Sequence, residues 1–444
     1  MERTPTEIWQ RILRLAISCS LLPLHGDYDH VQIRTISEVT CSLFLEYKQS
    51  ERTRTNLRLV CASWNEFLEQ YSDRFVRLTP YVPDGYWPPV KRWDRVIRLE
   101  GPAGHTCKKR CWPAFSMMSL WATQGPDVEE RKKTETLIRD KHLPLLGHRC
   151  KAIISPGPWK RDLESLDHIV LLNDDAIVAS DPAVYLSTLS TKYTNLQHLQ
   201  IYLPTLIVPG AHIEFPLLDT LSVTLATHID FPLPNPLLPS HGGLWDLPKL
   251  RYLEFDSTDT RICDINMFRL FLTQVGRTIT HFHLGKYLLE RRDVTNTLFS
   301  DNFYDSVPSL AYLGVGMHDL SQLPRLSDDY YSPPITIFLN IYRMWWWEGP
   351  PRELAKHLPK RWPPGRLGEV RLEVTWEEFR DRIHYHGASR QYSTSLMRRS
   401  FWSGDIEILD VLHITGQGLM DRAGFPFDAS IRESIVSIAS KAKP

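Results

Sequence analysis

Apolar side chains recur every three to four residues through the first seventy positions, which predicts short amphipathic helices. Thr4, Pro5 and Glu7 suit a helix cap, a first helical position and a capping box, so a helix is expected to start there. Further helices are expected over 31–46 and from Thr55 onward. The apolar stripes of the first and last helices are Ile8, Trp9, Ile12, Leu13, Ala16 and Ile17, and then Leu57, Val60, Cys61, Trp64, Phe67, Leu68 and Tyr71. Three short helices cannot bury all of the apolar side chains in these stripes by themselves. Part of each stripe is therefore expected to face a partner, or all of these residues belong to one larger helical core.

From about residue 160 a second pattern, apolar-x-x-apolar-x-apolar, recurs along the chain. Its occurrences are Leu166, Ile169, Leu171; Leu196, Leu199, Ile201; Leu218, Leu221, Val223; Leu250, Leu253, Phe255; Ile279, Phe282, Leu284; Leu310, Leu313, Val315; Leu367, Val370, Leu372; and Leu409, Leu412, Ile414, with an irregular one at Ile337, Leu339, Ile341. Most of them start about 22–32 residues apart. The last two apolar residues of each would lie on one face of a strand and point inward. Stacked units of this kind form a curved parallel sheet, although an ordinary α/β domain with apolar strands is the alternative.

The residues between these apolar positions are expected to point outward from the sheet. Tyrosine, histidine and mixed charge suit a protein-binding surface, while a solvated sheet face is the plainer interpretation. His168 and His413 are expected on the same face. The residues predicted to contact a target are Tyr202, Tyr252, Glu254, His281, His283, Tyr312 and Arg371.

Segments between the strands are expected to cover the other side of the sheet. Helical patterns occur over 264–274, 350–357 and 376–383, and a terminal capping helix is predicted over 428–442. Residues 93–99 are a candidate for an early strand. The pattern predicts a helical region over 1–78, a connecting region over 79–158 and a repeat region over 159–444.

Composition narrows the possible functions. Lys and Arg balance Asp and Glu at 52 each, so no bulk charge attracts nucleic acid or an anionic membrane. No stretch reaches the ~20 apolar residues of a membrane span, and none has the pattern of an export signal. Seven scattered cysteines suggest no disulfide framework. A cytoplasmic or nuclear protein is expected, with no membrane and no nucleic-acid partner.

Two groups of residues raise the possibility of metal chemistry. His105, Cys107 and Cys111, with His148 and Cys150 further along, have types and spacing acceptable for zinc, although loop histidines and free thiols are the simpler interpretation. The run of residues 173–175, Asn-Asp-Asp, follows an apolar strand and is suited to a divalent cation, or to an ordinary turn. No Walker loop, nucleophile elbow or zinc-protease motif occurs. We expect no metal, no cofactor and no catalytic residue, with a metal-dependent enzyme as an alternative.

The N-terminal region resembles the F-box, the helical module that attaches substrate receptors to the Skp adaptor of cullin–RING ubiquitin ligases. Pro5, Glu7, Ile8, Ile12 and Leu13 match the opening of its motif, and Leu57, Val60, Cys61 and Trp64 match its close. Thr4 stands where the motif has Leu, and the span between the two halves is longer than usual. The resemblance implies an adaptor interface, or its immediate support, made of Pro5, Ile8, Trp9, Ile12, Leu13, Leu59, Val60 and Trp64.

The later repeats resemble the leucine-rich repeats that commonly follow an F-box. This resemblance implies an α/β protein with a small helical F-box, an irregular leucine-rich-repeat solenoid and a curved parallel sheet. The implied function is that of a non-catalytic substrate receptor, which docks on the Skp adaptor and holds an unknown target protein for ubiquitylation by other subunits. The alternative within this family is a repeat scaffold whose degenerate F-box recruits partners without ubiquitylation.

Overall fold

The computed structural model forms two compact units, each described here by itself. The first comprises 1–27, 34–202 and 214–218, and the second comprises 28–33, 203–213 and 219–444. The residues that the structure describes are 5–19, 36–77, 92–100, 145–146, 149–154, 166, 168–177, 182–203, 212–225, 244–257, 265–285, 288, 299, 303–316, 334–340, 367–372, 374–381, 409–410, 413, 418–421 and 423–441. Within these ranges, the helices all fall short of the length and apolar character that a bilayer crossing requires.

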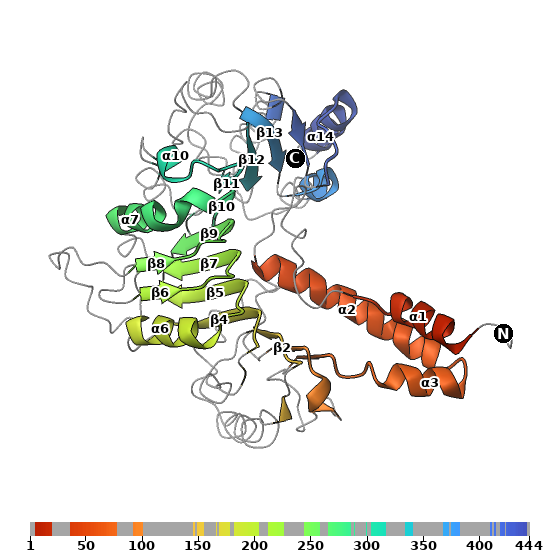
Figure 1. The fold of residues 1–444 in the computed structure, drawn as a ribbon. Coiled ribbons are helices and arrows are strands. Elements are labelled where there is room, and N and C mark those ends of the chain that lie inside the picture. The colour runs from red at the N-terminus through yellow and green to blue at the C-terminus, as the bar shows by residue number, and fades with distance from the viewer. Residues whose placement is uncertain are drawn as a thin grey trace, which may run out of the picture. The chain divides into compact units, whose positions relative to one another are not determined.

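Three helices open the first unit (Figure 1): α1 (Thr6–Ala16), α2 (Ile36–Arg58) and α3 (Ala62–Glu69). Pro5 occupies the cap position of α1, one residue later than the predicted cap at Thr4, and makes no side-chain capping hydrogen bond. The two helices predicted over 31–46 and from Thr55 are wrong in their boundaries. One helix, α2, spans the segment from Ile36 to Arg58 and so includes the start of the helix predicted from Thr55. The rest of that predicted helix is a turn, where Cys61 has an extended backbone (φ −161°, ψ 165°), and then α3.

The strands of the first unit lie side by side and parallel, in the order β1 to β5. They are β1 (Phe75–Arg77), β2 (Arg98–Glu100), β3 (Ala152–Ile154), β4 (Leu171–Ile177) and β5 (His198–Leu203), with the short helix η1 (Trp93–Arg95) before β2 and α6 (Pro182–Lys192) before β5. The strand expected over 93–99 is therefore a helical turn followed by β2. A row of aligned apolar residues, Val76, Leu99, Ile153, Leu172 and Leu199, crosses all five strands.

The second unit contains seven parallel strands among the described residues, in the order β7, β9, β10, β11, β12, β13 and β14. Their bounds are β7 (Thr220–Leu225), β9 (Tyr252–Ser257), β10 (His281–Leu284), β11 (Tyr312–Gly316), β12 (Ile335–Asn340), β13 (Leu367–Leu372) and β14 (Leu419–Met420). Cα registration aligns one inward apolar row: Leu221, Leu253, Phe282, Leu313, Ile337, Val370 and Leu419. Helices and parallel strands together confirm the predicted α/β class.

Two of the predicted strand positions are wrong. In β4, Leu172 pairs with Leu199 and Asp174 with Ile201, so the inward positions are displaced from Ile169 and Leu171. In β12, by contrast, Ile337 and Leu339 lie in the inward row as expected, because they pair with Leu313 and Val315. Residues 409, 410 and 413 are helical, and the next strand is β14. His168 and His413 accordingly lie outside the strands.

The inward face of the second unit is filled largely by aromatic side chains. Helix α7 (Ile265–Val275) confirms the helix predicted over 264–274, and its Phe268 stacks on Phe255 with 4.3 Å between ring centroids. The rings of Phe282 and Phe303 lie 5.5 Å apart. Short helices η5 (Gly276–Thr278) and α10 (Phe303–Ser306) follow α7, and a separate two-stranded sheet joins β6 (His212–Glu214) to β8 (Leu244–Asp246).

The C-terminal elements follow the predicted pattern. Residues 376–381 are helical, as expected within 376–383, and residues 350–357 lie outside the described residues. Helix α14 (Ala429–Lys441) confirms that the segment predicted over 428–442 is helical. Asp428 begins it, because its Oδ1 accepts a hydrogen bond of 2.8 Å from the N–H of Ile431, and Ile435 is buried.

Candidate functional site

Helix α1 divides its apolar residues between two faces. Leu13 and Ile17 point inward and form a buried cluster with Leu68 of α3. Leu57, Trp64, Phe67 and Tyr71 pack against this cluster. The module made by α1, α2 and α3 thus has its own small core, which uses only part of its apolar surface.

The other apolar face of the module stays open to solvent. On α1, Ile8, Ile12 and Leu15 are 49%, 44% and 65% exposed, and in the turn after α2, Leu59 and Val60 are 83% and 51% exposed. We call these five residues the docking face. Ile8, Ile12 and Leu15 follow i, i+4, i+7 spacing and therefore share one side of the helix. Large apolar residues exposed together are typical of a surface that binds another protein.

Two tryptophans form a contact between α1 and α3. Trp9 and Trp64 are half-buried, and their ring centroids are 5.4 Å apart. Pro5, which is exposed, precedes the same end of α1. Of the eight residues predicted for the interface, Leu13 alone is buried, so it supports the face from within. Sequence reasoning missed Leu15, although its place seven residues after Ile8 was a usable signal.

Cys61 lies beside Val60 at the start of α3. Its Sγ is 3.2 Å from Oγ of Ser63, and this hydrogen bond, with a second from the backbone N–H of Trp64, lowers the pKa of the exposed thiol. A lowered pKa increases the thiolate fraction at neutral pH. Cys61 therefore offers a chemical probe next to the docking face.

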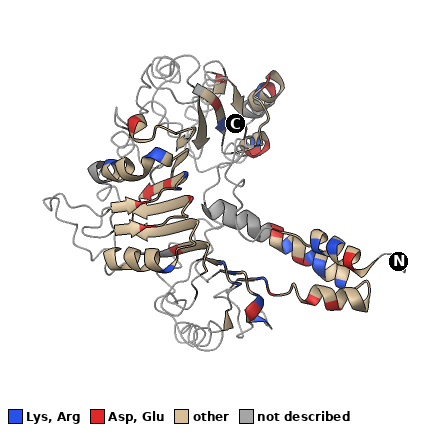
Figure 2. Ribbon diagram, in the orientation of Figure 1, with Lys and Arg blue, Asp and Glu red and all other residues tan. Residues whose placement is uncertain are grey.

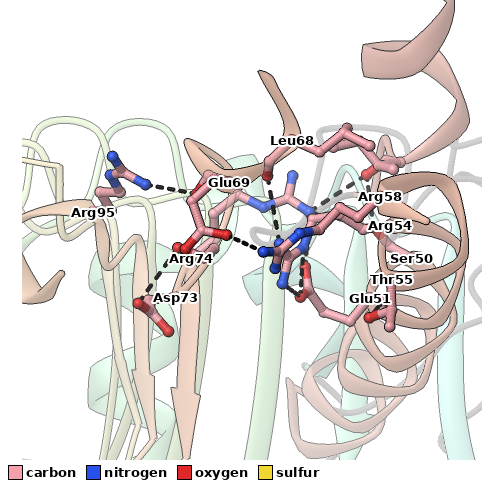
Figure 3. Close-up of polar contacts among 12 residues, drawn as sticks. Ser50, Glu51, Arg54, Thr55, Arg58, Leu68, Glu69, Asp73, Arg74 and Arg95 are labelled. Carbon is pink, nitrogen blue, oxygen red and sulfur yellow. Dashed lines mark hydrogen bonds and ion pairs between the residues drawn. The ribbon is translucent and has the colours of Figure 1, made fainter. Parts of the chain in front are cut away.

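A network of charged residues connects the three helices of the module to the segment just before β1 (Figure 3). Glu51 of α2 accepts hydrogen bonds from Arg54, at 2.8 and 2.6 Å, and forms an ion pair of 3.4 Å with Arg74. The same Arg74 nitrogen lies 3.3 Å from Oγ of Ser50 and 3.5 Å from the carbonyl oxygen of Ile17. Ser50 also donates to that carbonyl at 2.6 Å. The end of α1 is thereby held by α2 and by the residue just before β1.

The end of α3 is held in a similar way. Its last carbonyls accept hydrogen bonds from arginines, Leu68 from Arg54 at 3.4 Å and Glu69 from Arg95 at 2.7 Å. Cations at a helix C-terminus stabilise its unpaired carbonyls and complement its dipole. Arg58 of α2 also forms an ion pair of 2.5 Å with the Glu69 carboxylate. The α3 end is thus tied both to α2 and to the segment before β2.

Basic side chains are frequent on α1 and α2 (Figure 2). Arg11 and Arg14 of α1 are exposed, and the Arg14 guanidinium lies 5.6 Å from the ring centroid of Phe67. Lys48 and Arg52 are exposed on α2. The docking face is therefore accompanied by positive charge on the same helices.

The residues predicted to contact a target lie on the outward face of the strands. In the second unit Tyr252, Glu254, His281 and His283 are buried, while Tyr312 and Arg371 are half-buried. In the first unit Tyr202 is half-buried. Parallel strands are commonly covered on both faces, which the outward positions of β7 and β9 illustrate, since every residue of these two strands is buried.

Close packing fixes the two histidines of β10. The His281 ring stacks on Tyr312 with 4.3 Å between centroids and 11° between planes, and its Nδ1 lies 2.8 Å from Oγ1 of Thr280. Nδ1 of His283 donates to the carbonyl of Leu284 at 2.8 Å. A Cβ at Gly314 would lie only 2.1 Å from Cδ2 of His283, so a glycine is required beside this ring.

Of the residues considered for zinc binding, the structure describes Cys150. His105, Cys107, Cys111 and His148 lie outside the described residues. Cys150 is a buried free thiol, and burial raises its pKa to about 12. Among the side chains that the structure describes, no three His, Cys, Asp or Glu residues converge to hold a metal.

Asp174 has a structural partner on α6. Asn173 and Asp174 are successive residues of β4 and so point to opposite faces of the sheet. The hydroxyl of Tyr185 donates a hydrogen bond to the buried Asp174 carboxylate. Burial, followed by the nearby Asp174 charge, raises the pKa of Tyr185 well above its usual value, so this hydroxyl keeps its proton. The pair ties α6 to β4.

Protein-family models, curated proteins and solved structures were all compared with the chain, and none of them matches it.

Proposed function

We propose that this protein is a substrate receptor of a Skp–cullin–F-box ubiquitin ligase, in which α1, α2 and α3 act as the F-box. The observation that carries the proposal is the docking face. Ile8, Ile12 and Val60, which match the F-box motif, are exposed after the module has formed its own core. Complete burial of an exposed side chain of this size contributes about 1.5–3 kcal/mol, and covering these half-exposed residues would contribute part of that amount each.

The repeat region would then hold the target. The inward rows of β7 to β14 are consistent with an irregular leucine-rich-repeat solenoid, in which each unit buries its apolar face against its neighbours. Within the second unit, Tyr312 and Arg371 retain accessible surface, so we assign direct target contact to them. The buried residues Tyr252, His281 and His283 would support them from below. The chain supplies proximity and orientation, and other subunits supply the chemistry.

The proposal is tested by adaptor binding to the full-length chain. The wild-type chain should co-purify with the Skp adaptor, and Ile12→Asp or Val60→Asp should each weaken that binding by at least about tenfold, because a carboxylate would replace a buried apolar contact. Val184→Asp is the matched control, since Val184 on α6 is also an exposed valine, away from the docking face.

Far-UV circular dichroism and thermal unfolding establish that each variant folds. Absence of adaptor binding by the wild-type chain, or equal binding by Val60→Asp and Val184→Asp, would exclude the proposed docking mode.

A further inference from the structure

The connection between α3 and β1 contains unusual backbone geometry. Asp73 has a φ of 59°, the left-handed region that few residues other than glycine adopt. The side chain of Asp73 accepts a hydrogen bond of 3.3 Å from the backbone N–H of Arg92, in the segment before β2. A sharp reversal is therefore fixed between α3 and the first strand.

The residue after this reversal reaches back into the helices. Arg74 is largely buried, and one of its nitrogens faces three oxygen atoms, from Ile17, Ser50 and Glu51, at 3.3 to 3.5 Å (Figure 3). Its guanidinium also lies over the rings of Tyr47 and Tyr71, at 5.9 and 5.8 Å from their centroids. One side chain thus contacts the end of α1, the body of α2 and the residues that follow α3.

Tyr47 continues the same connection into the sheet. Its ring meets Phe75 of β1 edge-on, with 5.1 Å between centroids, and both residues are buried. Arg98 of β2 in turn lies 4.7 Å over the Phe75 ring. Helices and first strands are therefore joined by continuous packing, and both belong to the same compact unit.

From this geometry we infer that Arg74 is a positioning residue, which fixes the direction of the docking face relative to strands β1 to β5. Without the Arg74 side chain, its contacts with Ile17, Ser50 and Glu51 would be lost, while the packing of Tyr47 on Phe75 would stay. Because fewer contacts would then join the helices to β1, the reversal at Asp73 would act as a hinge. The significance for ubiquitylation rests on the proposed function, since a receptor must present its target at a fixed orientation to the adaptor. The rigidity itself does not depend on that function.

The inference is tested by a distance distribution between two spin labels in the full-length chain. One label is placed on Cys61 and the other on Val184→Cys of α6, both exposed and both in the first unit, with the other six cysteines replaced by alanine. The parent should give one narrow peak, and Arg74→Met should broaden it roughly twofold or split it, as a released hinge does. Arg74→Lys, which keeps a cationic donor, should restore most of the narrow peak.

Arg92→Met is the matched control. Arg92 is exposed and its guanidinium pairs with the neighbouring Asp94, so its loss should leave the peak unchanged. Should Arg74→Met fail to fold, Ser50→Ala with Glu51→Ala removes the two side-chain acceptors while keeping Arg74. An unchanged peak in folded Arg74→Met or in the double variant would overturn the inference. Adaptor binding measured on the same samples separates this inference from the proposed function. Arg74→Met should keep the dissociation constant for the adaptor within about twofold of the parent value. If the proposed function is wrong, the parent itself will not bind the adaptor.

Discussion

At the scale of single residues, the thiols of Cys61 and Cys150 differ in pKa. Cys61 is exposed and its pKa is lowered by the hydroxyl of Ser63, whereas Cys150 is buried and its pKa is raised to about 12. The thiolate is the reactive form, so at pH 7 iodoacetamide should modify Cys61 and spare Cys150 while the chain is folded. Mass spectrometry of the labelled peptides, followed over pH, measures both rates.

Ser63→Ala provides the control for this prediction. Removing the hydroxyl takes away the largest stabilisation of the Cys61 thiolate, so the pH at which labelling rises should move upward. Cys150 should become reactive only when denaturant unfolds the first unit. A Ser63→Ala profile that overlays the parent profile would show that the hydrogen bond between Cys61 and Ser63 has no effect in solution.

At the scale of elements, the contact between β10 and β11 depends on a missing side chain. A Cβ at residue 314 would lie 2.1 Å from Cδ2 and 2.6 Å from Nε2 of His283, so Gly314→Ala must displace that ring. The expected loss in free energy of unfolding is about 1–3 kcal/mol, the usual cost of overpacking. Urea denaturation of the full-length chain measures it.

A double-mutant cycle isolates the cause. In a His283→Ala background the ring is gone, so adding Gly314→Ala should then cost much less than it does in the parent. Equal costs in the two backgrounds would mean that the backbone of residue 314, and not the His283 ring, resists the substitution.

The same scale shows how far the sequence predicts this fold. Strands with apolar residues at alternating positions, such as Leu253 and Phe255, were predicted in the correct register because burial demands that spacing. The register of β4 was missed because its inward position holds Asp174, whose partner on α6 is invisible to a periodicity argument. The break between α2 and α3 was missed for a related reason: Cys61 is no helix breaker, and tertiary contacts such as Arg58 with Glu69 fold α3 back.

The candidate site was predicted in part. Matching motif residues placed Ile12 and Val60 correctly on an exposed surface, since amphipathic spacing leaves them outside the core. The outward sheet positions were less predictable, because alternation gives the direction of a side chain but not what covers it. His281 and Tyr252 have the expected direction and are nevertheless buried.

At the scale of the whole molecule, zero net charge and an exposed apolar face both favour self-association of the chain. The sequence pI is about 7.3, and the formal net charge is zero at pH 7. Repulsion between chains is therefore weakest near pH 7.3 and grows on either side. We expect the chain alone, without the proposed Skp adaptor, to self-associate through the docking face most strongly near that pH, at low ionic strength. Static light scattering across pH 6 to 9 would follow this.

Two matched substitutions distinguish the effect of net charge on self-association from the effect of the docking face. Val60→Asp and Val184→Asp each add one negative charge at an exposed valine, so any effect of net charge is the same in both. If the docking face causes association, Val60→Asp should suppress scattering much more than Val184→Asp, and added adaptor should do so as well. Equal suppression by the two variants would assign the association to charge alone. In that case the docking face, on α1 and in the turn after α2, would not be the surface through which this chain associates with itself.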